Sequence, residues 1–315
     1  MRDYQQLNKI HYYLSEFSRW PIPACFFRRK LPAYLEEVKN RTDSIHIHHR
    51  VDYYNRLCEH FSIIDGVRVG QFRDIKRSTY YFDTRRYLNY YPSHYQFNYL
   101  FGDVINTPET PAILKSRPIA NDNQNSVLMK LNKIRHFRFI NDRRLYSKKK
   151  DCIVWRGAVH LEHRRFAVET FYDHPQCDIG QTNKKAKGVP WQKPFLSVGE
   201  QLQNKFILCI EGNDVASNLK WAMSSNSLVF MTKPKFETWF MEGTLIPGHH
   251  YVEIKDDYSD MIEKMDYYLS HPGEAEAIIH NANGHIAQFL DTRRESLISL
   301  LVLEKYFRLS GQTNC

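Results

Sequence analysis

The stretch Lys205–Phe230, KFILCIEGNDVASNLKWAMSSNSLVF, decides the fold of this chain. Its apolar run Phe206–Ile210 is short enough to be a buried strand. A polar turn, Glu211–Asp214, follows, and a helical run extends from Val215 to about Ser225. A second apolar run, Leu228–Phe230, ends the stretch. The succession of strand, turn, helix and strand predicts a parallel βαβ unit.

The turn of such a unit is a natural place for a ligand. Ligands bind where the carboxyl end of the strand meets the amino end of the helix. The free backbone N–H groups and the helix dipole at that point favour anionic groups such as a diphosphate. The stretch therefore predicts a nucleotide or phosphate site.

Composition limits the class of protein without choosing a partner. The 315 residues are 42% hydrophobic and 25% charged, which is typical of one large or two modest globular domains. The 44 basic and 35 acidic residues give a net charge of +9 and a pI near 9.1. A basic surface suits nucleic acid, an anionic membrane or a phosphorylated small molecule.

The cysteines and the start of the chain indicate a soluble protein of a reducing compartment, which we expect to be cytoplasmic. The six cysteines are scattered, with neither zinc-site spacing nor a secreted disulfide framework. The first twenty residues are too polar for a signal peptide, and no apolar run approaches a membrane span. The cluster His46–His49 alternates with Ile45 and Ile47, so we interpret it as a half-exposed strand and expect no metal there.

Regular alternation of strands and helices begins near Asp151 and predicts a parallel sheet covered on both faces. Residues 1–145 are less regular, and Ser147–Lys150 is a candidate hinge. Helices are expected at Leu31–Lys39, Val51–Phe61, Arg164–Tyr172, after a Ser197–Glu200 capping box, and at Asp260–Leu269, Glu274–Leu290 and Arg293–Leu309. Strands are expected at Ile45–His49, Val67–Phe72, Ile153–Trp155, Cys177–Ile179 and Tyr251–Ile254.

Three blocks of the chain resemble glycosyltransferase family 90, which groups capsule-associated, lipopolysaccharide-modifying and protein O-glucosyl or O-xylosyl transferases. The blocks are Val154–Gly157 with His163 and Arg164, then Lys205–Phe230, and finally Trp239–Asp260. Their order and spacing are similar to the family over about residues 100–290.

Within this family the chain most resembles the bacterial lipopolysaccharide core branch. The resemblance lies in Phe101–Ile119, with FGDV and KSRPI, in EGNDVASNLKW at Glu211–Trp221, and in WFMEG at Trp239–Gly243.

The resemblance implies an α/β fold with two Rossmann-like domains facing each other across a cleft, the GT-B type. Residues 1–145 would bind the acceptor and residues 146–290 the nucleotide-sugar, with a carboxyl-terminal helix at 291–315 packing back. It also implies inverting transfer from a UDP-sugar, with no essential metal and no other cofactor.

An inverting transfer needs a base that deprotonates the acceptor hydroxyl. Asp103, between apolar neighbours and before a Pro-bounded loop, falls where the family places its catalytic aspartate. The family pattern would have an Arg-Asp-x-Pro type sequence here, whereas this chain has Gly102 before the acid. A turn or helix-capping aspartate is the alternative.

Arg156, Gly157 and Arg164 are the first donor-binding candidates. A glycine after a strand allows close backbone approach, and an arginine at a helix start can form paired hydrogen bonds to phosphate oxygens. Protein O-glucosyltransferases have a serine after the equivalent glycine, and this chain has Ala158. A solvated helix arginine is the alternative for Arg164.

The βαβ turn supplies further candidates. Asn218 stands where eukaryotic family members carry a diphosphate-binding arginine, so another cation is needed, for which Lys115 and Arg117 from across the cleft are candidates. Exposed loop charges are the alternative for these two. Glu237 could bind sugar or ribose hydroxyls, or simply be a surface glutamate at a helix start. The remaining candidates of the turn are Gly212, Asp214, Ser217 and Lys220.

Two functions compete at this point. The first is transfer of a hexose from a UDP-sugar to a lipopolysaccharide core or related glycan, with peripheral contact to an anionic membrane. The second is a non-catalytic α/β protein that binds an anion or nucleic acid. The basic residues are not gathered in one arm and no RNA-binding signature occurs, which disfavours nucleic acid.

Overall fold

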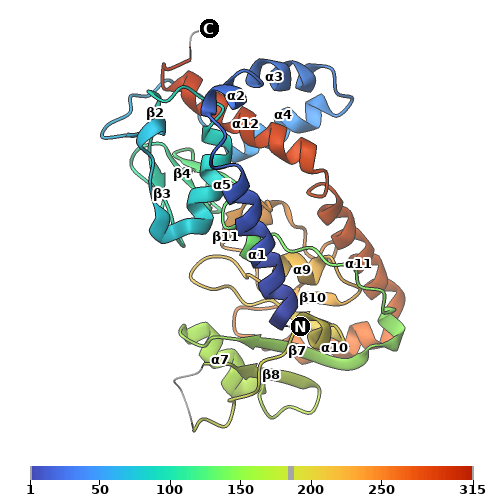
Figure 1. Ribbon diagram of the computed structural model, residues 1–315. Coiled ribbons are helices and arrows are strands. Elements are labelled where there is room, and N and C mark those ends of the chain that lie inside the picture. The colour runs from blue at the N-terminus through green and yellow to red at the C-terminus, as the bar shows by residue number, and fades with distance from the viewer. Residues whose placement is uncertain (1, 184–187, 314–315) are drawn as a thin grey trace. The chain divides into compact units, whose positions relative to one another are not determined.

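The structure is a computed structural model that describes residues 2–183 and 188–313 (Figure 1). Its contacts divide the chain into two compact units. The first unit contains His136–Lys235 and Glu242–Gln288. The second contains Asp3–Arg135, Phe236–Met241 and the chain from Phe289 onward. The segment predicted as a hinge lies within the first unit, where the buried Lys149 ammonium contacts the Asp142 carboxylate at 2.6 Å.

Five strands of the described chain form a parallel sheet in the first unit, in the order β12-β10-β9-β7-β8. From β7 the chain adds β8 on one side, then returns to β9 and adds β10 and β12 on the other. The sheet is therefore doubly wound, with its switch point between β7 and β9. The strands are β7 (Lys150–Gly157), β8 (Cys177–Gln181), β9 (Asn204–Leu208), β10 (Leu228–Met231) and β12 (Val252–Glu253).

Both faces of this sheet are buried, as the sequence predicted. On one face Trp155, Phe206 and Phe230 belong to a core cluster shared with three helices. On the other face Val154 and Ile207 are 0% exposed. Burial on both faces explains the continuous apolar runs of these strands. The helices of the core cluster are α7 (Glu162–Phe171), α10 (Met261–Ser270) and α11 (Pro272–Ala287).

Two short helices belong to the region of the βαβ unit: one precedes its first strand, and the other connects its two strands. The capping box is confirmed, because the Ser197 side chain accepts from the Glu200 N–H while the Glu200 carboxylate accepts from the Ser197 N–H, starting α8 (Val198–Gln201). The connecting helix α9 (Leu219–Met223) begins later than predicted. The Asn218 side chain donates to the Leu208 carbonyl at 2.9 Å, and such side-chain bonds favour turns over helix.

The second unit combines small sheets with helices. Strands β3 (Tyr99–Leu100), β4 (Ala112–Leu114) and β6 (Ser126–Leu128) form a parallel sheet in the order β3-β4-β6. Antiparallel pairs join β1 (Val67–Arg68) to β2 (Gln96–Phe97) and β5 (Ser116–Pro118) to β11 (Phe236–Thr238). Its helices are α1 (Arg2–Ser18), α2 (Ala24–Arg28), α3 (Leu31–Lys39), α4 (Ser44–Tyr54), α5 (Ser78–Leu88) and α12 (Thr292–Leu309), and α6 (Lys133–His136) lies where the chain enters the first unit.

The predicted strand Ile45–His49 is wrong, because these residues belong to α4. Ile45 is 73% exposed and Ile47 is 0% exposed, which resembles strand alternation. Positions two apart on a helix also point in nearly opposite directions, at about 100° per residue. Only the longer spacing of the buried Ile47, Val51 and Tyr54 distinguishes the helix. The predicted strand Val67–Phe72 is also too long, since β1 ends at Arg68.

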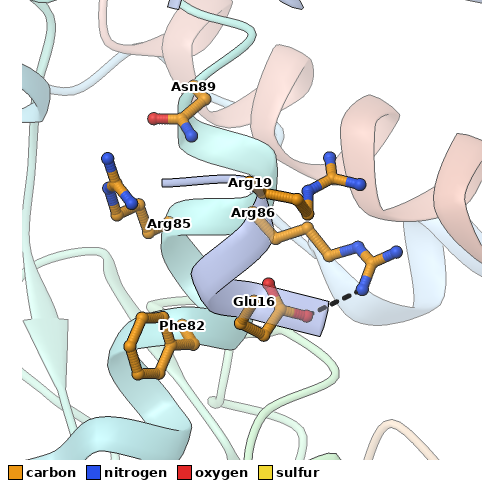
Figure 2. A pocket seen from close by; sticks show the side chains of 6 residues that line it. All are labelled: Glu16, Arg19, Phe82, Arg85, Arg86 and Asn89. Atoms are coloured by element: carbon orange, nitrogen blue, oxygen red, sulfur yellow. Dashed lines mark hydrogen bonds and ion pairs between the residues drawn. The ribbon is translucent and has the colours of Figure 1, made fainter. Parts of the chain in front are cut away.

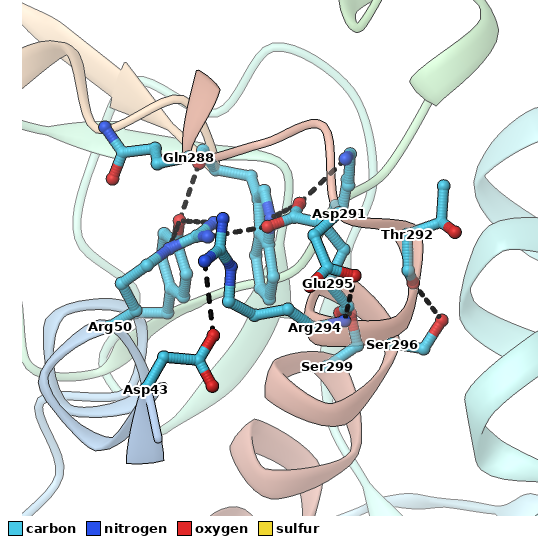
Figure 3. Close-up of polar contacts among 12 residues, drawn as sticks. Asp43, Arg50, Gln288, Asp291, Thr292, Arg294, Glu295, Ser296 and Ser299 are labelled. Atoms are coloured by element: carbon cyan, nitrogen blue, oxygen red, sulfur yellow. Dashed lines mark hydrogen bonds and ion pairs between the residues drawn. The ribbon is translucent and has the colours of Figure 1, made fainter. Parts of the chain in front are cut away.

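A buried charge network joins α4 to α12 in the second unit (Figure 3). The Glu295 carboxylate, 4% exposed, lies 2.6 Å from Arg50 and 2.7 Å from Lys130. The indole N–H of Trp239 donates to the same carboxylate at 2.8 Å. Because two cations share one acid, removing that acid leaves buried charge uncompensated.

We predict that Glu295→Ala lowers the free energy of unfolding by about 3–5 kcal/mol, the cost of breaking a buried ion pair. Urea unfolding measures it. The matched control is Glu36→Ala, which removes an exposed ion pair with Lys39 and should cost at most about 1 kcal/mol. Equal losses in the two variants would contradict a structural role for the network.

Candidate functional site

Arg164 lies at the switch point of the first unit's sheet. Its guanidinium donates to the carbonyl of Ala158, in the loop after β7, at 3.0 Å. It also donates to the carbonyls of Ile210 and Glu211, in the loop after β9, at 3.0 and 2.7 Å. One side chain of α7 therefore holds together the two loops where a doubly wound sheet binds its ligands.

Two glycines leave room for the side chains that pack against the loops after β7 and β9. A Cβ at Gly157 would come within 2.4 Å of the Trp155 ring, and a Cβ at Gly212 would lie 3.3 Å from the Arg164 guanidinium. The Trp155 ring in turn lies 5.6 Å from the Arg164 guanidinium carbon. The structure thus brings Gly157, Gly212 and Arg164 together at one edge of the sheet.

The other candidates of the βαβ turn lie along the same segment. Asn218 joins the start of α9 to the end of β9 through its bond to the Leu208 carbonyl. Lys220 forms an ion pair with Glu242, and both side chains are 1% exposed. Asp214 is buried, whereas Ser217 is half-buried in the turn before α9.

Arg156 is directed toward the edge strand β8. Its guanidinium lies 2.7 Å from the Asp178 carboxylate and donates to the Asp178 carbonyl at 2.6 Å. Partial burial of Asp178 raises the pKa of its carboxyl, but the hydrogen bonds and charges of Arg156 and Lys193 together outweigh it, so the net pKa is lowered. Arg156 thereby ties β7 to β8.

In the second unit Asp103 meets Lys115 at the carboxyl ends of two adjacent parallel strands. Asp103 follows β3 and Lys115 follows β4, and Leu100 and Leu114 are in register. The Lys115 ammonium lies 2.6 Å from the Asp103 carboxylate. The lysine side chain is 1% exposed and the aspartate side chain 29% exposed. The buried ammonium therefore balances the charge of the carboxylate, which stays accessible to solvent.

Gly102 fits this geometry through its backbone. Its φ of 120° lies in a region that residues with a side chain rarely adopt. A Cβ there would meet nothing within 4 Å, so conformation rather than space requires the glycine. The backbone conformation before Asp103 therefore favours glycine at this position.

Arg117 and Glu237 form a buried pair in the second unit. They are cross-strand partners on β5 and β11, with the guanidinium 2.7 Å from the carboxylate. Arg117 also donates to the Tyr53 carbonyl at 2.7 Å, and the Tyr53 hydroxyl donates to Glu237. Both charged side chains are at most 1% exposed. Burial lowers the pKa of Arg117, and the charge of Glu237 offsets only part of that shift.

Sequence reasoning missed the acids that neutralise the predicted cations. Asp178 pairs with Arg156, and Glu242 pairs with Lys220. Glu242 had a signal, since it follows the apolar run Trp239–Met241, and a charged residue in apolar surroundings indicates a buried partner.

Two negative findings hold for the residues that the structure describes. No group of three or more His, Cys, Asp or Glu side chains among them is placed to hold a metal ion. None of their helices is both long and apolar enough to cross a membrane.

Comparisons with known proteins give the family. The family model described as Glycosyl transferase family 90 matches residues 127–311. O-glucosyltransferase LpsA of Dichelobacter nodosus is 41% identical over 309 residues, 97% of this chain and 97% of that protein. Human Protein O-glucosyltransferase 3 is 26% identical over 168 residues, 51% of this chain and 32% of that protein.

Among solved structures, the C-terminal domain of a glycosyl transferase group 1 family protein (LpcC) from Francisella tularensis aligns with 48% of this chain and 94% of its own. The identity is 13% and the TM-score 0.32, too slight a likeness to bear on the fold.

The chain therefore belongs to glycosyltransferase family 90, and it is a glycosyltransferase. The resemblance identified in the sequence is confirmed.

We predict that Glu237→Ala, which leaves the Arg117 guanidinium buried without its carboxylate, costs about 3–5 kcal/mol of unfolding free energy in urea. Lys235→Ala, which removes an exposed ion pair with Asp256, is the control and should cost at most about 1 kcal/mol.

The double variant Arg117→Met/Glu237→Met should recover most of that loss, because an apolar pair needs no charge balance. A Glu237→Ala protein as stable as the control would mean that the pair does not stabilise the second unit.

Proposed function

We propose that the protein transfers a hexose from a UDP-sugar to a lipopolysaccharide core or a related glycan, with inversion at the transferred sugar. The observation that carries this proposal is the Arg164 contact with both loops of the switch point, in a chain that belongs to family 90. The similarity over nearly the whole length to a bacterial O-glucosyltransferase supports the reaction class.

The donor diphosphate is proposed to bind at the two loops that Arg164 holds. In a trans peptide the C=O and N–H point in opposite directions. Because the carbonyls of Ile210 and Glu211 point toward the guanidinium, the N–H groups of Glu211 and Gly212 point away from it. We propose these two N–H groups as donors to the diphosphate, as in other loops between strand and helix.

Asp103 is the proposed base. Its carboxylate would take the proton of the acceptor hydroxyl while that oxygen forms a bond to the anomeric carbon. The bond from that carbon to the diphosphate breaks on the opposite face, and the diphosphate leaves with the electron pair. Lys115 acts as a positioning residue, since its buried ammonium holds the carboxylate from within.

The two units are proposed to be the donor and acceptor domains of a GT-B glycosyltransferase. The first unit, with the doubly wound sheet, would bind the nucleotide-sugar, and the second, with Asp103, the acceptor. Their facing arrangement, the absence of an essential metal, a cytoplasmic location and peripheral contact with an anionic membrane stay predictions from the sequence. Family membership favours this function over non-catalytic binding of an anion or nucleic acid.

The diphosphate is proposed to be bound mainly by main-chain N–H groups, with the Arg164 charge acting from the other side of the same peptide groups. Arg156 and Lys220 already have carboxylate partners within the first unit. Lys115 and Arg117 are likewise paired and buried in the second unit, so a phosphate contact would require those pairs to open.

We predict that Asp103→Asn lowers turnover by about 10²–10⁴-fold, the range for loss of a general base, with nearly unchanged affinity for the UDP-sugar. UDP release measures turnover and calorimetry measures affinity. Asp122→Asn, an exposed aspartate of the same unit, is the control. Turnover retained in the Asp103 variant would remove this residue as the base.

We predict that Arg164→Ala weakens UDP binding by about 1.5–3 kcal/mol, the range for hydrogen bonds to a charged group, because the two loops lose their common partner. Arg165→Ala, on the exposed side of α7, should leave the affinity unchanged.

Arg164→Lys should fail to restore binding, since one ammonium cannot reproduce the planar set of donors that reaches three carbonyls. Full affinity in Arg164→Ala would show that the loops bind UDP without it.

A further inference from the structure

Helix α1 presents an apolar stripe to solvent. Ile10, Leu14 and Phe17 follow one another at spacings of four and three, which places them on one face of a helix. They are 49%, 63% and 54% exposed. The opposite face carries Tyr12 and Glu16, which are buried. One face of α1 is therefore buried, whereas the apolar stripe on the opposite face is exposed.

Exposed apolar residues continue beyond the helix in the sequence, and the Trp20 ring lies 6.4 Å from the Phe17 ring. Trp20, Ile22 and Phe26 are 37%, 41% and 54% exposed. Isolated exposed apolar residues are ordinary on protein surfaces, but six within seventeen residues are a marked concentration. We name Ile10, Leu14, Phe17, Trp20, Ile22 and Phe26 the N-terminal apolar surface.

This surface is fixed to the second unit rather than loose. The Tyr12 hydroxyl donates to Asp83 of α5 at 2.9 Å, and burial together with that carboxylate raises the pKa of Tyr12. The Phe17 ring lies 5.3 Å from the Phe82 ring, edge to face. These contacts order the backbone in advance, so docking would cost little conformational entropy.

Basic residues lie beside the N-terminal apolar surface, both in the sequence and at the end of α1. Arg28, Arg29 and Lys30 follow Phe26 directly in the sequence. Figure 2 shows Arg19, Arg85 and Arg86 around a shallow hollow where the end of α1 meets α5. Arg86 pairs with Glu16 at 2.8 Å, and the Arg85 guanidinium stacks 4.2 Å from the Trp20 ring.

We propose that the N-terminal apolar surface docks on an anionic lipid bilayer. Exposed aliphatic and aromatic side chains flanked by Arg and Lys are the composition of surfaces that lie in the headgroup region of a membrane. The arginine and lysine stems can extend toward headgroup phosphates while the apolar residues enter the acyl boundary. A second copy of the chain fits less well, because two such sets of basic residues would repel each other.

This inference extends the proposed function in one respect, since docking would bring a membrane-held glycolipid acceptor to the second unit. The test needs neither donor nor acceptor. Purified protein is floated with vesicles of phosphatidylcholine containing phosphatidylglycerol, and with phosphatidylcholine alone. The protein should float with the anionic vesicles and be released from them as salt is raised.

Phe26→Glu should weaken vesicle binding about tenfold or more, because a large apolar side chain is lost and a negative charge gained at an anionic surface. Phe195→Glu is the matched control, since Phe195 is also 54% exposed and lies in the first unit. Its binding should equal that of the unchanged protein.

A second pair of variants tests whether the basic residues after Phe26 contribute to vesicle binding. Arg29→Gln with Lys30→Gln should weaken binding about fivefold for each charge removed, whereas Lys233→Gln with Lys255→Gln, on the first unit, should change it little.

Three results would overturn the proposal: no preference for anionic vesicles, equal losses in the Phe26 and Phe195 variants, or a dimer in sedimentation velocity that Phe26→Glu dissociates. A protein that releases UDP during transfer but never floats would refute the docking surface alone. One that floats without transferring sugar would refute only the proposed reaction.

Discussion

The guanidinium of Arg164 donates hydrogen bonds to three main-chain carbonyls that belong to two different loops. Those loops follow β7 and β9, where the order of the parallel sheet reverses. A planar group with donors in a fixed fork can satisfy such a set, whereas a flexible ammonium cannot. A Cβ at Gly157 would clash with the Trp155 ring, and a Cβ at Gly212 would crowd the guanidinium. The conformation of the proposed diphosphate site therefore depends on this one side chain.

The remaining charged candidates are balanced within their own units. Lys220 has Glu242, Arg156 has Asp178, and Arg117 has Glu237. Buried pairs of this kind contribute modestly to net stability, but losing one partner is costly. In the Lys115–Asp103 pair, as in the Arg156–Asp178 pair, the cation is buried while the carboxylate stays partly exposed. That asymmetry suits a base, which must hold its charge and still reach a substrate hydroxyl.

Local patterns predicted the parts of the fold whose signals lie close together in sequence. The two apolar runs of Lys205–Phe230 form neighbouring parallel strands, and the Ser197–Glu200 capping box starts a helix where expected. Alternation over only a few residues misled at Ile45–His49, where helix and strand look alike. The pairing of Arg117 with Glu237 depends on strand register between segments 120 residues apart, which no local pattern encodes. The sequence assigned Glu237 to donor binding, which stays a prediction; the structure places it in the second unit, paired with Arg117.

The most direct measurement of the central claim is hydrogen exchange of the amides with and without UDP. If the loops held by Arg164 bind the diphosphate, UDP should slow exchange in peptides covering Gly157–Arg164 and Cys209–Asp214, and Arg164→Ala should abolish that protection. Slowed exchange confined to other segments, or protection by an oligonucleotide with none by UDP, would contradict the account.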